Sequence, residues 1–293
     1  MTAAALKLIA MLSMLADHLG FTLRAAGLVK NYQSYLWLRS AGRLAFPIFA
    51  YLIGEGLRYT RDRRRYLRRL WACALVSAVP YSLLCGSPGG GGVPVWSALC
   101  ALAALCALAF AVMSSRDRDA LPLLAWISGA VVMSLPHLSL GELCLLSPSL
   151  NTLYTLALGA SLVAFLEKLR EPSASPRERL LYLLAALLLL PGLGGRVSLG
   201  FPGLALVLAF GLLREWKWAR LAAAVLWCFA EFWPGTPQNL RFLLFSLAAV
   251  ACLALYGGQK GRSRLPKNFF YWFYPLHLLL LAAVKAAAVL GRL

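Results

Sequence analysis

Two neighbouring ionisable residues, Asp17 and His18, lie within the apolar stretch "MLADHLG" near the start of the chain. Charged side chains are costly inside an apolar helix, so they are usually paired there or have a function. A histidine can stay neutral in such a place and still exchange a proton near pH 7. His18 is therefore a candidate for proton transfer, with a buried, hydrogen-bonded structural histidine as the alternative. A second histidine, His277, lies in the apolar stretch "FYPLHLLLL" and can complete the same site.

The elements that position these residues are predicted to be membrane-spanning helices. The 293 residues are 61% hydrophobic, the mean hydropathy is +0.72, and apolar runs of roughly twenty residues recur from end to end. We expect an all-α polytopic membrane protein with about ten or eleven transmembrane helices, in a single domain over residues 1–293. Neither a P-loop nor a metal-ligand cluster is found, which argues against an ATP-driven pump and a metalloenzyme. The candidate spans are 5–25, 41–58, 70–86, 96–113, 120–136, 150–168, 180–194, 198–214, 219–234, 240–257 and 268–290.

The distribution of charge predicts the orientation of these helices. The formal net charge is +18, and most of the 29 basic residues fall in alternate loops between the candidate spans. Basic loops stay on the cytoplasmic side, which places the N-terminus inside and, with eleven spans, the C-terminus outside. Membrane topology thus accounts for the positive charge, and no nucleic-acid partner is expected. His18 and His277 then both lie near the middle of the membrane.

Depth in the membrane suggests partners for the charged residues. Lys7 and His18 are separated by about three helical turns and share a helix face, whereas Asp17 points roughly 100° away. The next span runs in the opposite direction, with Arg39 and Arg43 near its outer end and Glu55 near its inner end. Antiparallel packing would bring Asp17 toward Arg43 and Lys7 toward Glu55.

A basic segment over residues 58–69, "RYTRDRRRYLRR", allows two interpretations. It can be a cytoplasmic anchor that touches anionic lipids. It can also bind the phosphates of a coenzyme A thioester, because an arginine fork donates two hydrogen bonds to a phosphate and a tyrosine can stack on a base. The candidate residues for binding this co-substrate are Arg43, Arg61, Arg64, Arg65, Tyr66, Arg68 and Arg69.

The cysteines and the remaining histidine carry less information. Most of the seven cysteines fall in predicted spans as small apolar residues, whereas Cys85 and Cys144 lie near loops on one predicted side. A disulfide between these two is possible. His137 follows Pro136 in a predicted outer loop, where a solvated side chain is expected.

Several segments together resemble the TraX family, namely "LKLIAMLSMLADHLG", "LRSAGRLAFPIFAYLIGEGLRYTRDRRRYLRRL", "NTLYTLALG", "GFPGLALVLAFGLLRE" and "FYPLHLLLL". The resemblance spans nearly the whole chain and implies an integral-membrane acetyltransferase of the bacterial inner membrane. The conjugative-plasmid member of the family acetylates the N-terminal amine of a pilin subunit. The first span is also similar to transmembrane acyltransferases that modify cell-surface glycans, which carry a basic residue, ten intervening residues and a histidine. Lys7 and His18 match this spacing, so the resemblance implies a catalytic His18 with Lys7, in place of the more frequent arginine, as its basic partner.

The residues and the resemblance together predict a reaction. An acyl-CoA such as acetyl-CoA is made in the cytosol and is the expected co-substrate, and the acceptor is an amine or hydroxyl at or beyond the membrane. We expect His18 to act as general base or acyl relay, Lys7 or Arg43 to stabilise an oxyanion, Asp17 to orient the helix pair and His277 to complete the site. The acceptor stays open between a peptide amine, a glycan and a small molecule. Two other functions stay open as well: a transporter or flippase of a lipid-linked or small polar substrate, and a scaffold for a surface appendage.

Overall fold

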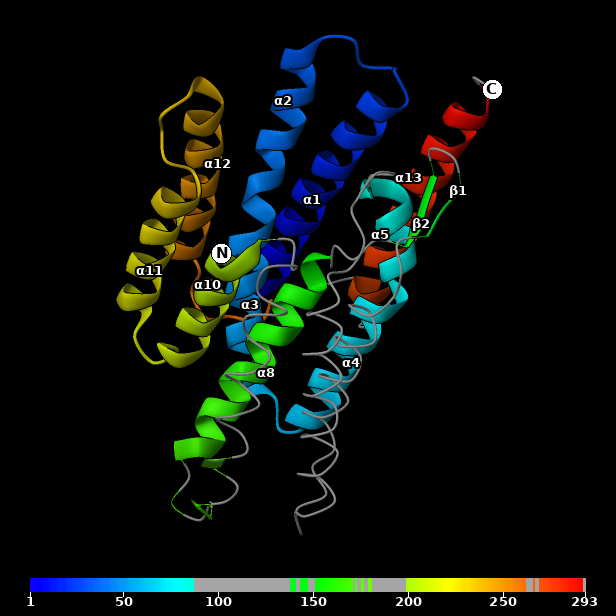
Figure 1. Cartoon of the computed structure of the whole chain (residues 1–293). Helices are drawn as coiled ribbons and strands as arrows, with labels where there is room; N and C mark the ends of the chain where they lie inside the picture. Colours follow the sequence, from blue (N-terminus) through cyan, green and yellow to red (C-terminus); the bar gives the residue numbers. More distant parts are fainter. Residues whose placement is uncertain are drawn as a thin grey trace. The chain divides into compact units, whose positions relative to one another are not determined.

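The computed structural model describes residues 1–86, 138–140, 143–146, 151–170, 199–261 and 269–291, together with residues 172, 175–176, 179–180 and 266 (Figure 1). In this part of the chain the fold is all-α, apart from one short β-hairpin. Two compact units are formed, one of Met1–Tyr59 with Ala209–Leu293 and the other of Thr60–Leu208. Within the described residues, three helices are long and apolar enough to cross a membrane: α1 (Ala3–Ala25), α12 (Pro237–Ala254) and α13 (Phe269–Leu290). The protein is accordingly an all-α membrane protein.

The first unit is built on an antiparallel pair of helical segments. Thr2 caps α1, since its hydroxyl accepts a hydrogen bond from the backbone N–H of Ala5 and satisfies one free donor of the first turn. Ser13 Oγ donates to the carbonyl of Ala41 at 2.6 Å and so ties α1 to the returning segment. That segment consists of α2 (Tyr32–Ala41), the 3-10 turn η1 (Gly42–Leu44) and α3 (Ala45–Tyr59), which follow one another without a break.

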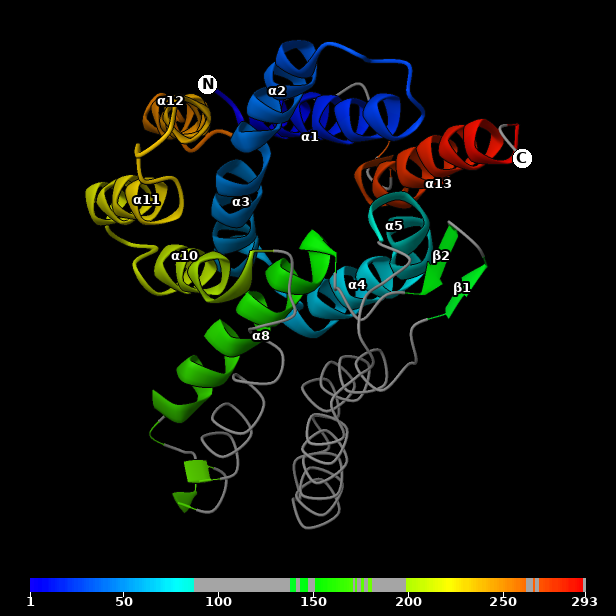
Figure 2. The same cartoon turned by 45° about the horizontal axis from the view of Figure 1, so that its top comes forward.

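Aromatic contacts join this pair to the helices that follow later in the chain. These helices are α11 (Lys217–Glu231) and α12, which follow α10 (Gly200–Leu212) in the chain. The rings of Phe46 on α3 and Trp227 on α11 lie 5.6 Å apart, and those of Trp37 on α2 and Phe245 on α12 lie 6.1 Å apart. Figure 2 shows α11 and α12 beside the segment formed by α2, η1 and α3. The hydroxyl of Thr236 caps α12, and Pro237 occupies its first turn, where a missing N–H costs little.

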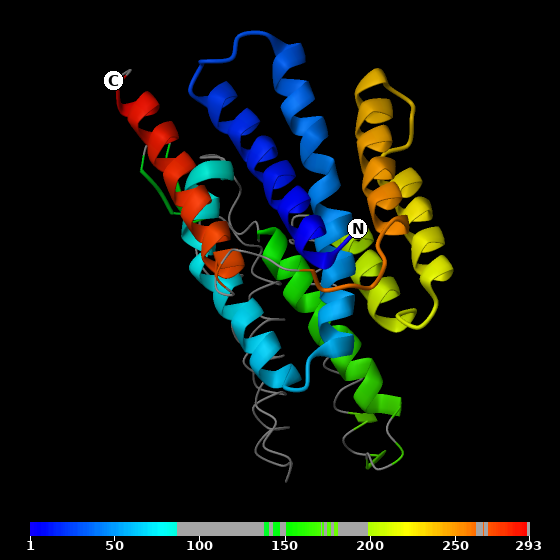
Figure 3. The ribbon, with the colours of Figure 1, turned by 180° about the vertical axis from the view of Figure 1, so that it is seen from behind.

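The last helix, α13, lies alongside α1 and runs in the same direction (Figures 2 and 3). Near the start of both helices, the Lys7 ammonium lies 5.1 Å from the centre of the Phe270 ring. Near their ends, the Lys285 ammonium lies 5.9 Å from the centre of the Phe21 ring. The two contacts follow in the same order along both helices, so α1 and α13 are parallel. The middle of α1 therefore lies next to the middle of α13.

The second unit is held by polar contacts between α4 (Arg63–Val76) and α8 (Thr152–Arg170). Trp71 Nε1 donates to Ser161 Oγ at 3.0 Å, Asn151 Nδ2 donates to the carbonyl of Ala74 at 2.8 Å, and Arg63 forms an ion pair with Glu167. The unit also contains α5 (Ala78–Cys85) and the antiparallel strands β1 (Leu138–Leu140) and β2 (Leu143–Leu146).

Most predicted spans within the described residues correspond to observed helices with shifted ends. Spans 5–25, 150–168, 198–214, 219–234, 240–257 and 268–290 correspond to α1, α8, α10, α11, α12 and α13. Span 41–58 starts too late, because the helical segment already begins at Tyr32. The predictions for spans 96–113, 120–136 and 180–194 and for His137 lie outside the described residues.

The expectation of a basic loop over residues 58–69 is wrong. Only residues 60–62 are non-helical, because Asp62 caps α4 by accepting a hydrogen bond from the backbone N–H of Arg65 at 2.8 Å. Arginine is a good helix former, so a run of arginines does not end a helix. Predicted span 70–86 is accordingly two helices, α4 and α5, with Ser77 between them. The possible disulfide of Cys85 with Cys144 stays a prediction, because the side chain of Cys144 lies outside the described residues.

Candidate functional site

The two histidines singled out in the sequence form a direct hydrogen bond. His18 Nδ1 and His277 Nε2 lie 2.8 Å apart, although the residues are separated by 259 positions in the chain. Both side chains are buried, with exposed fractions of 7% and 5%. The parallel packing of α1 and α13 causes this meeting, since both histidines lie at the same level of the two helices. The structure therefore brings His277 to His18, and the part of His277 in a reaction stays a prediction.

The hydrogen bonds of His277 determine which nitrogen of His18 is available for chemistry. His277 Nδ1 lies 2.8 Å from the backbone carbonyl of Phe273, and a carbonyl can only accept. Neutral His277 therefore carries its proton on Nδ1, and its Nε2 must accept the hydrogen bond that His18 Nδ1 donates. This tautomer leaves a lone pair on His18 Nε2, for which the described residues provide no hydrogen-bond partner. His18 is thus oriented as a proton acceptor at Nε2.

Aromatic rings fix the orientation of both imidazoles. The His277 ring stacks on Phe273, with ring centres 4.8 Å apart and an angle of 16° between the planes, and it lies edge to edge with the His18 ring, at 5.1 Å and 19°. The Tyr274 ring meets both histidines edge-on, at 6.5 Å from His18 and 5.6 Å from His277. A stacked and edge-supported imidazole loses little further freedom during a reaction, which favours a preorganised base.

Asp17 binds two arginines from the returning segment. Its Oδ1 lies 2.7 Å from Arg43 Nη2, and its Oδ2 lies 2.6 Å from Arg39 Nη1. The predicted pairing of Asp17 with Arg43 is confirmed, and Arg39 is a second partner that the prediction missed. The four-residue spacing of Arg39 and Arg43 is the signal for it, because residues i and i+4 share a helix face. The side chain of Asp17 is only 14% exposed, so this cluster of three charges is largely removed from water.

Glycines permit the close approach that the Asp17 cluster needs. A Cβ at Gly42 would collide with the side chain of Asp17, and a Cβ at Gly20 would lie 2.8 Å from Cβ of Leu38. Only glycine fits at these two contacts between α1 and the segment of α2 and η1 without a shift of the backbone. Gly20 in "ADHLG" and Gly42 in "SAGRL" therefore allow these two stretches to pack closely against each other.

Gly42→Ala is expected to lower stability by about 1–3 kcal/mol, because the added methyl group overpacks a well-packed contact. The measurement is thermal unfolding of the detergent-purified protein beside wild type. Gly257→Ala is the matched control, since a Cβ at Gly257 meets nothing within 4 Å. An unfolding temperature of Gly42→Ala that equals that of Gly257→Ala would contradict the proposed close contact.

The predicted pairing of Lys7 with Glu55 is wrong. Glu55 Oε1 lies 2.7 Å from Arg220 Nη1 on α11, and Tyr256 donates a longer bond of 3.5 Å to Glu55 Oε2. Lys7 instead lies over Phe270, and a distance of about 16 Å along α1 separates it from His18. Depth in the membrane alone suggested Lys7 as the partner of Glu55. It missed Arg220, which α11 brings to the same level.

A family model described as TraX protein matches residues 2–127 and 105–285. The chain belongs to the TraX family. The resemblance drawn from the sequence is thus confirmed, and the TraX match includes both histidines and the Asp17 cluster. No curated protein and no solved structure matches the chain.

The other predicted site residues of this TraX chain are distributed over two units. Arg43 belongs to the first unit and is engaged by Asp17. Arg61 and the candidate residues of α4 belong to the second unit, where Arg61, Arg65, Arg68 and Arg69 are exposed and Tyr66 is partly buried. Within the described residues, no group of three or more His, Cys, Asp and Glu side chains is placed to hold a metal ion. The histidine pair with the Asp17 cluster is therefore the best-defined candidate site of this TraX protein.

Proposed function

We propose that this TraX protein is an integral-membrane acyltransferase. It transfers an acetyl group from cytosolic acetyl-CoA to an amine or hydroxyl acceptor at or beyond the membrane. The observation that carries the proposal is the lone pair on His18 Nε2, which the hydrogen bonds from His18 to His277 and from His277 to Phe273 leave available. A buried neutral imidazole with one defined basic nitrogen is suited to general base catalysis.

The proposed step balances in atoms and charge. The acceptor nitrogen or oxygen attacks the thioester carbonyl carbon while His18 Nε2 takes its proton. The tetrahedral oxyanion then collapses, the carbon–sulfur bond breaks, and the proton passes from His18 to the departing thiolate. The products are the acetylated acceptor and CoA with a free thiol. His277 stays neutral and keeps Nδ1 of His18 protonated, so it acts as a positioning residue.

Arg43 is better placed than Lys7 to stabilise the oxyanion. Arg43 binds the residue next to His18, whereas Lys7 lies about three helical turns away along α1. A fixed guanidinium in a site with little water stabilises developing negative charge strongly. We therefore assign Arg43 to the oxyanion in the proposed mechanism and give Lys7 no contact with the reacting atoms.

The helix directions support the proposed topology. If α1 and α13 both cross the membrane, their parallel packing requires an odd number of crossings, as eleven spans would give. Exposed tryptophans lie near both ends of α11, with Trp218 78% exposed near its start and Trp233 70% exposed after its end. Tryptophan prefers the two membrane interfaces, so this pattern supports a further crossing by α11. We propose a multi-pass location in the bacterial inner membrane with the N-terminus inside.

The test of the function is the release of CoA thiol by detergent-purified protein supplied with acetyl-CoA. Peptides with a free N-terminus, amino sugars and glycans are offered as acceptors, and mass spectrometry identifies the acetylated product. We expect thiol release that depends on one acceptor class and produces equimolar acetylated acceptor. A well-folded wild type that releases no thiol with any acceptor, but moves a small polar substrate across a vesicle membrane, would favour the transporter alternative.

A further inference from the structure

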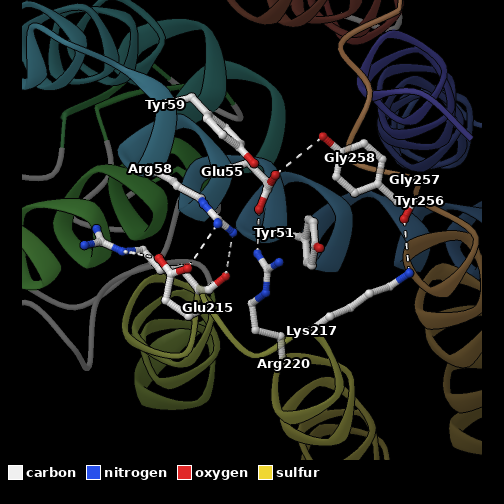
Figure 4. A pocket seen from close by; sticks show the side chains of 11 residues that line it. Tyr51, Glu55, Arg58, Tyr59, Glu215, Lys217, Arg220, Tyr256, Gly257 and Gly258 are labelled. Carbon is white, nitrogen blue, oxygen red and sulfur yellow. Dashed lines mark hydrogen bonds and ion pairs between the residues drawn. The ribbon is translucent and has the colours of Figure 1, made fainter.

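A pocket of about 340 Å³ opens among the ends of α3, α11 and α12 in the first unit (Figure 4). This volume falls within the range of roughly 300–1,000 Å³ that is common for ligand sites. Four basic side chains line it, Arg58, Arg214, Lys217 and Arg220, against the two acidic side chains of Glu55 and Glu215. The positive excess indicates an anionic ligand.

The inner part of the pocket is buried and retains an unused donor. Glu55 and Arg220 form an ion pair whose side chains are 9% and 5% exposed, and the Arg220 guanidinium lies 4.2 Å from the centre of the Tyr51 ring. Arg220 Nε is buried and has no hydrogen-bond partner among the described residues. A buried N–H without a partner is costly in a protein interior, so a site that contains one is suited to an acceptor group from a ligand.

The rim of the pocket holds an exposed carboxylate between two arginines. Glu215 Oε2 lies 3.0 Å from Arg58 Nη2, and Glu215 Oε1 lies 3.6 Å from Arg214 Nε. The Glu215 side chain is 62% exposed, and such an ion pair is weak in water. A phosphate carries more charge and more acceptor oxygens than a carboxylate, so it can replace Glu215 at these guanidinium groups.

Two further features suit a nucleotide. The hypothetical Cβ atoms of Gly257 and Gly258 meet nothing within 4 Å, so the space beside this backbone is open to a ligand. Tyr59 is 64% exposed at the rim, and the Arg58 guanidinium lies 5.3 Å from the centre of its ring. An exposed tyrosine next to an arginine offers a stacking surface for a base.

We propose that this pocket binds the phosphate-bearing nucleotide end of the acyl-CoA donor, with phosphates at Arg58 and Arg214 and the adenine against Tyr59. The identity of the ligand rests on the proposed function. The pocket adjoins the N-terminus, since the backbone N–H of Gly257 donates to the carbonyl of Met1. From the start of α1 to His18 the helix rises by about 22 Å. In this proposal the pantetheine arm runs from the pocket along α1 toward the histidine pair.

Two neighbouring substitutions have opposite expected effects. In Arg58→Gln the Kd of the purified full chain for acetyl-CoA and for adenosine 3′,5′-bisphosphate rises by roughly five- to tenfold, because a charge-assisted bond to phosphate is lost. In Glu215→Gln both Kd values fall by about two- to fivefold, because the internal competitor loses its charge. The matched controls are Lys30→Gln and Asp62→Asn, which make the same charge changes at exposed positions outside the pocket lining. Both controls are expected to stay within about twofold of wild type.

The outcomes separate this inference from the proposed function. Unchanged Kd values in both pocket variants, with wild type still releasing CoA thiol, would overturn the pocket assignment and leave the acyltransferase in place. Binding of inorganic phosphate without binding of acetyl-CoA or the bisphosphate would also overturn it. Binding of acetyl-CoA that depends on Arg58 in a wild type without any thiol release would support the pocket and contradict the transferase.

Discussion

Replacing His18 with alanine is expected to lower acetyl-CoA-dependent thiol release by roughly 100-fold or more, which is the usual contribution of a positioned general base. The Kd for acetyl-CoA is expected to stay within about twofold of wild type, because in the proposed mechanism His18 takes a proton in the transition state and adds little to ground-state binding. The measurements are steady-state thiol release and equilibrium binding on the same detergent preparation.

His277 provides the test of the hydrogen-bond chain. His277→Gln keeps an oxygen that can accept the hydrogen bond from His18 Nδ1, whereas His277→Ala removes the acceptor. We expect kcat to fall in the order wild type, His277→Gln, His277→Ala, with KM for acetyl-CoA nearly constant. A structural role alone would not produce rescue by glutamine. His137→Ala is the control for the loss of a histidine, since the sequence predicts a solvated loop position for that residue.

Full activity in well-folded His18→Ala would contradict the assigned chemistry. In that case the buried pair of His18 and His277 would be a structural contact between α1 and α13. A loss of acetyl-CoA binding together with activity would instead indicate that the variant no longer keeps the two helices in register. Thermal unfolding of each variant distinguishes these two cases.

The sequence predicted the long apolar helices well, because a run of apolar residues has few other stable structures. The predicted helix boundaries were wrong where a helix begins with polar or charged residues. Arg63–Val76 begins with charged residues, and only the capping carboxylate of Asp62 marks the start of the helix. The helix start at Tyr32 was missed for a similar reason, although Asn31 caps it by accepting a hydrogen bond from the N–H of Gln33. Local capping groups were therefore more informative than hydropathy at these boundaries.

The residues of the candidate site could be selected from the sequence by type, but most of their contacts could not. His18 and His277 stood out as histidines in apolar stretches, yet no spacing rule links two residues in the first and last helices. The parallel direction of α1 and α13, fixed by many side chains along both helices, determines their contact. The Asp17–Arg43 pair was predicted from depth because only one helix supplied basic residues at that level. The same argument failed for Glu55, since Arg220 arrives from α11, whose neighbours the sequence does not reveal.

Replacing Asp17 with asparagine is expected to lower the free energy of unfolding by about 3–5 kcal/mol. The change keeps the shape of the side chain but leaves Arg39 and Arg43, which are 26% and 18% exposed, without their shared counter-ion. The uncompensated charges repel each other and remain largely desolvated, which is the main cost when one member of a buried ion cluster is removed. Thermal unfolding in detergent is the measurement, and we expect a fall in Tm of several degrees.

The arginines provide the control for this prediction. If unpaired positive charge causes the loss, then Asp17→Asn combined with Arg39→Gln and Arg43→Gln is more stable than Asp17→Asn alone, although more contacts are removed. Arg39→Gln alone is expected to cost less than Asp17→Asn, because Arg43 still binds the carboxylate. A triple variant that is less stable than Asp17→Asn would contradict the charge explanation, because the other contacts of the arginines, such as that of Arg43 with the Phe242 ring, would then outweigh the unpaired charge. The activity of the triple variant is also informative, because the proposed oxyanion role of Arg43 requires its charge. Recovered stability without recovered thiol release would therefore separate the structural role of Asp17 from the catalytic role of Arg43.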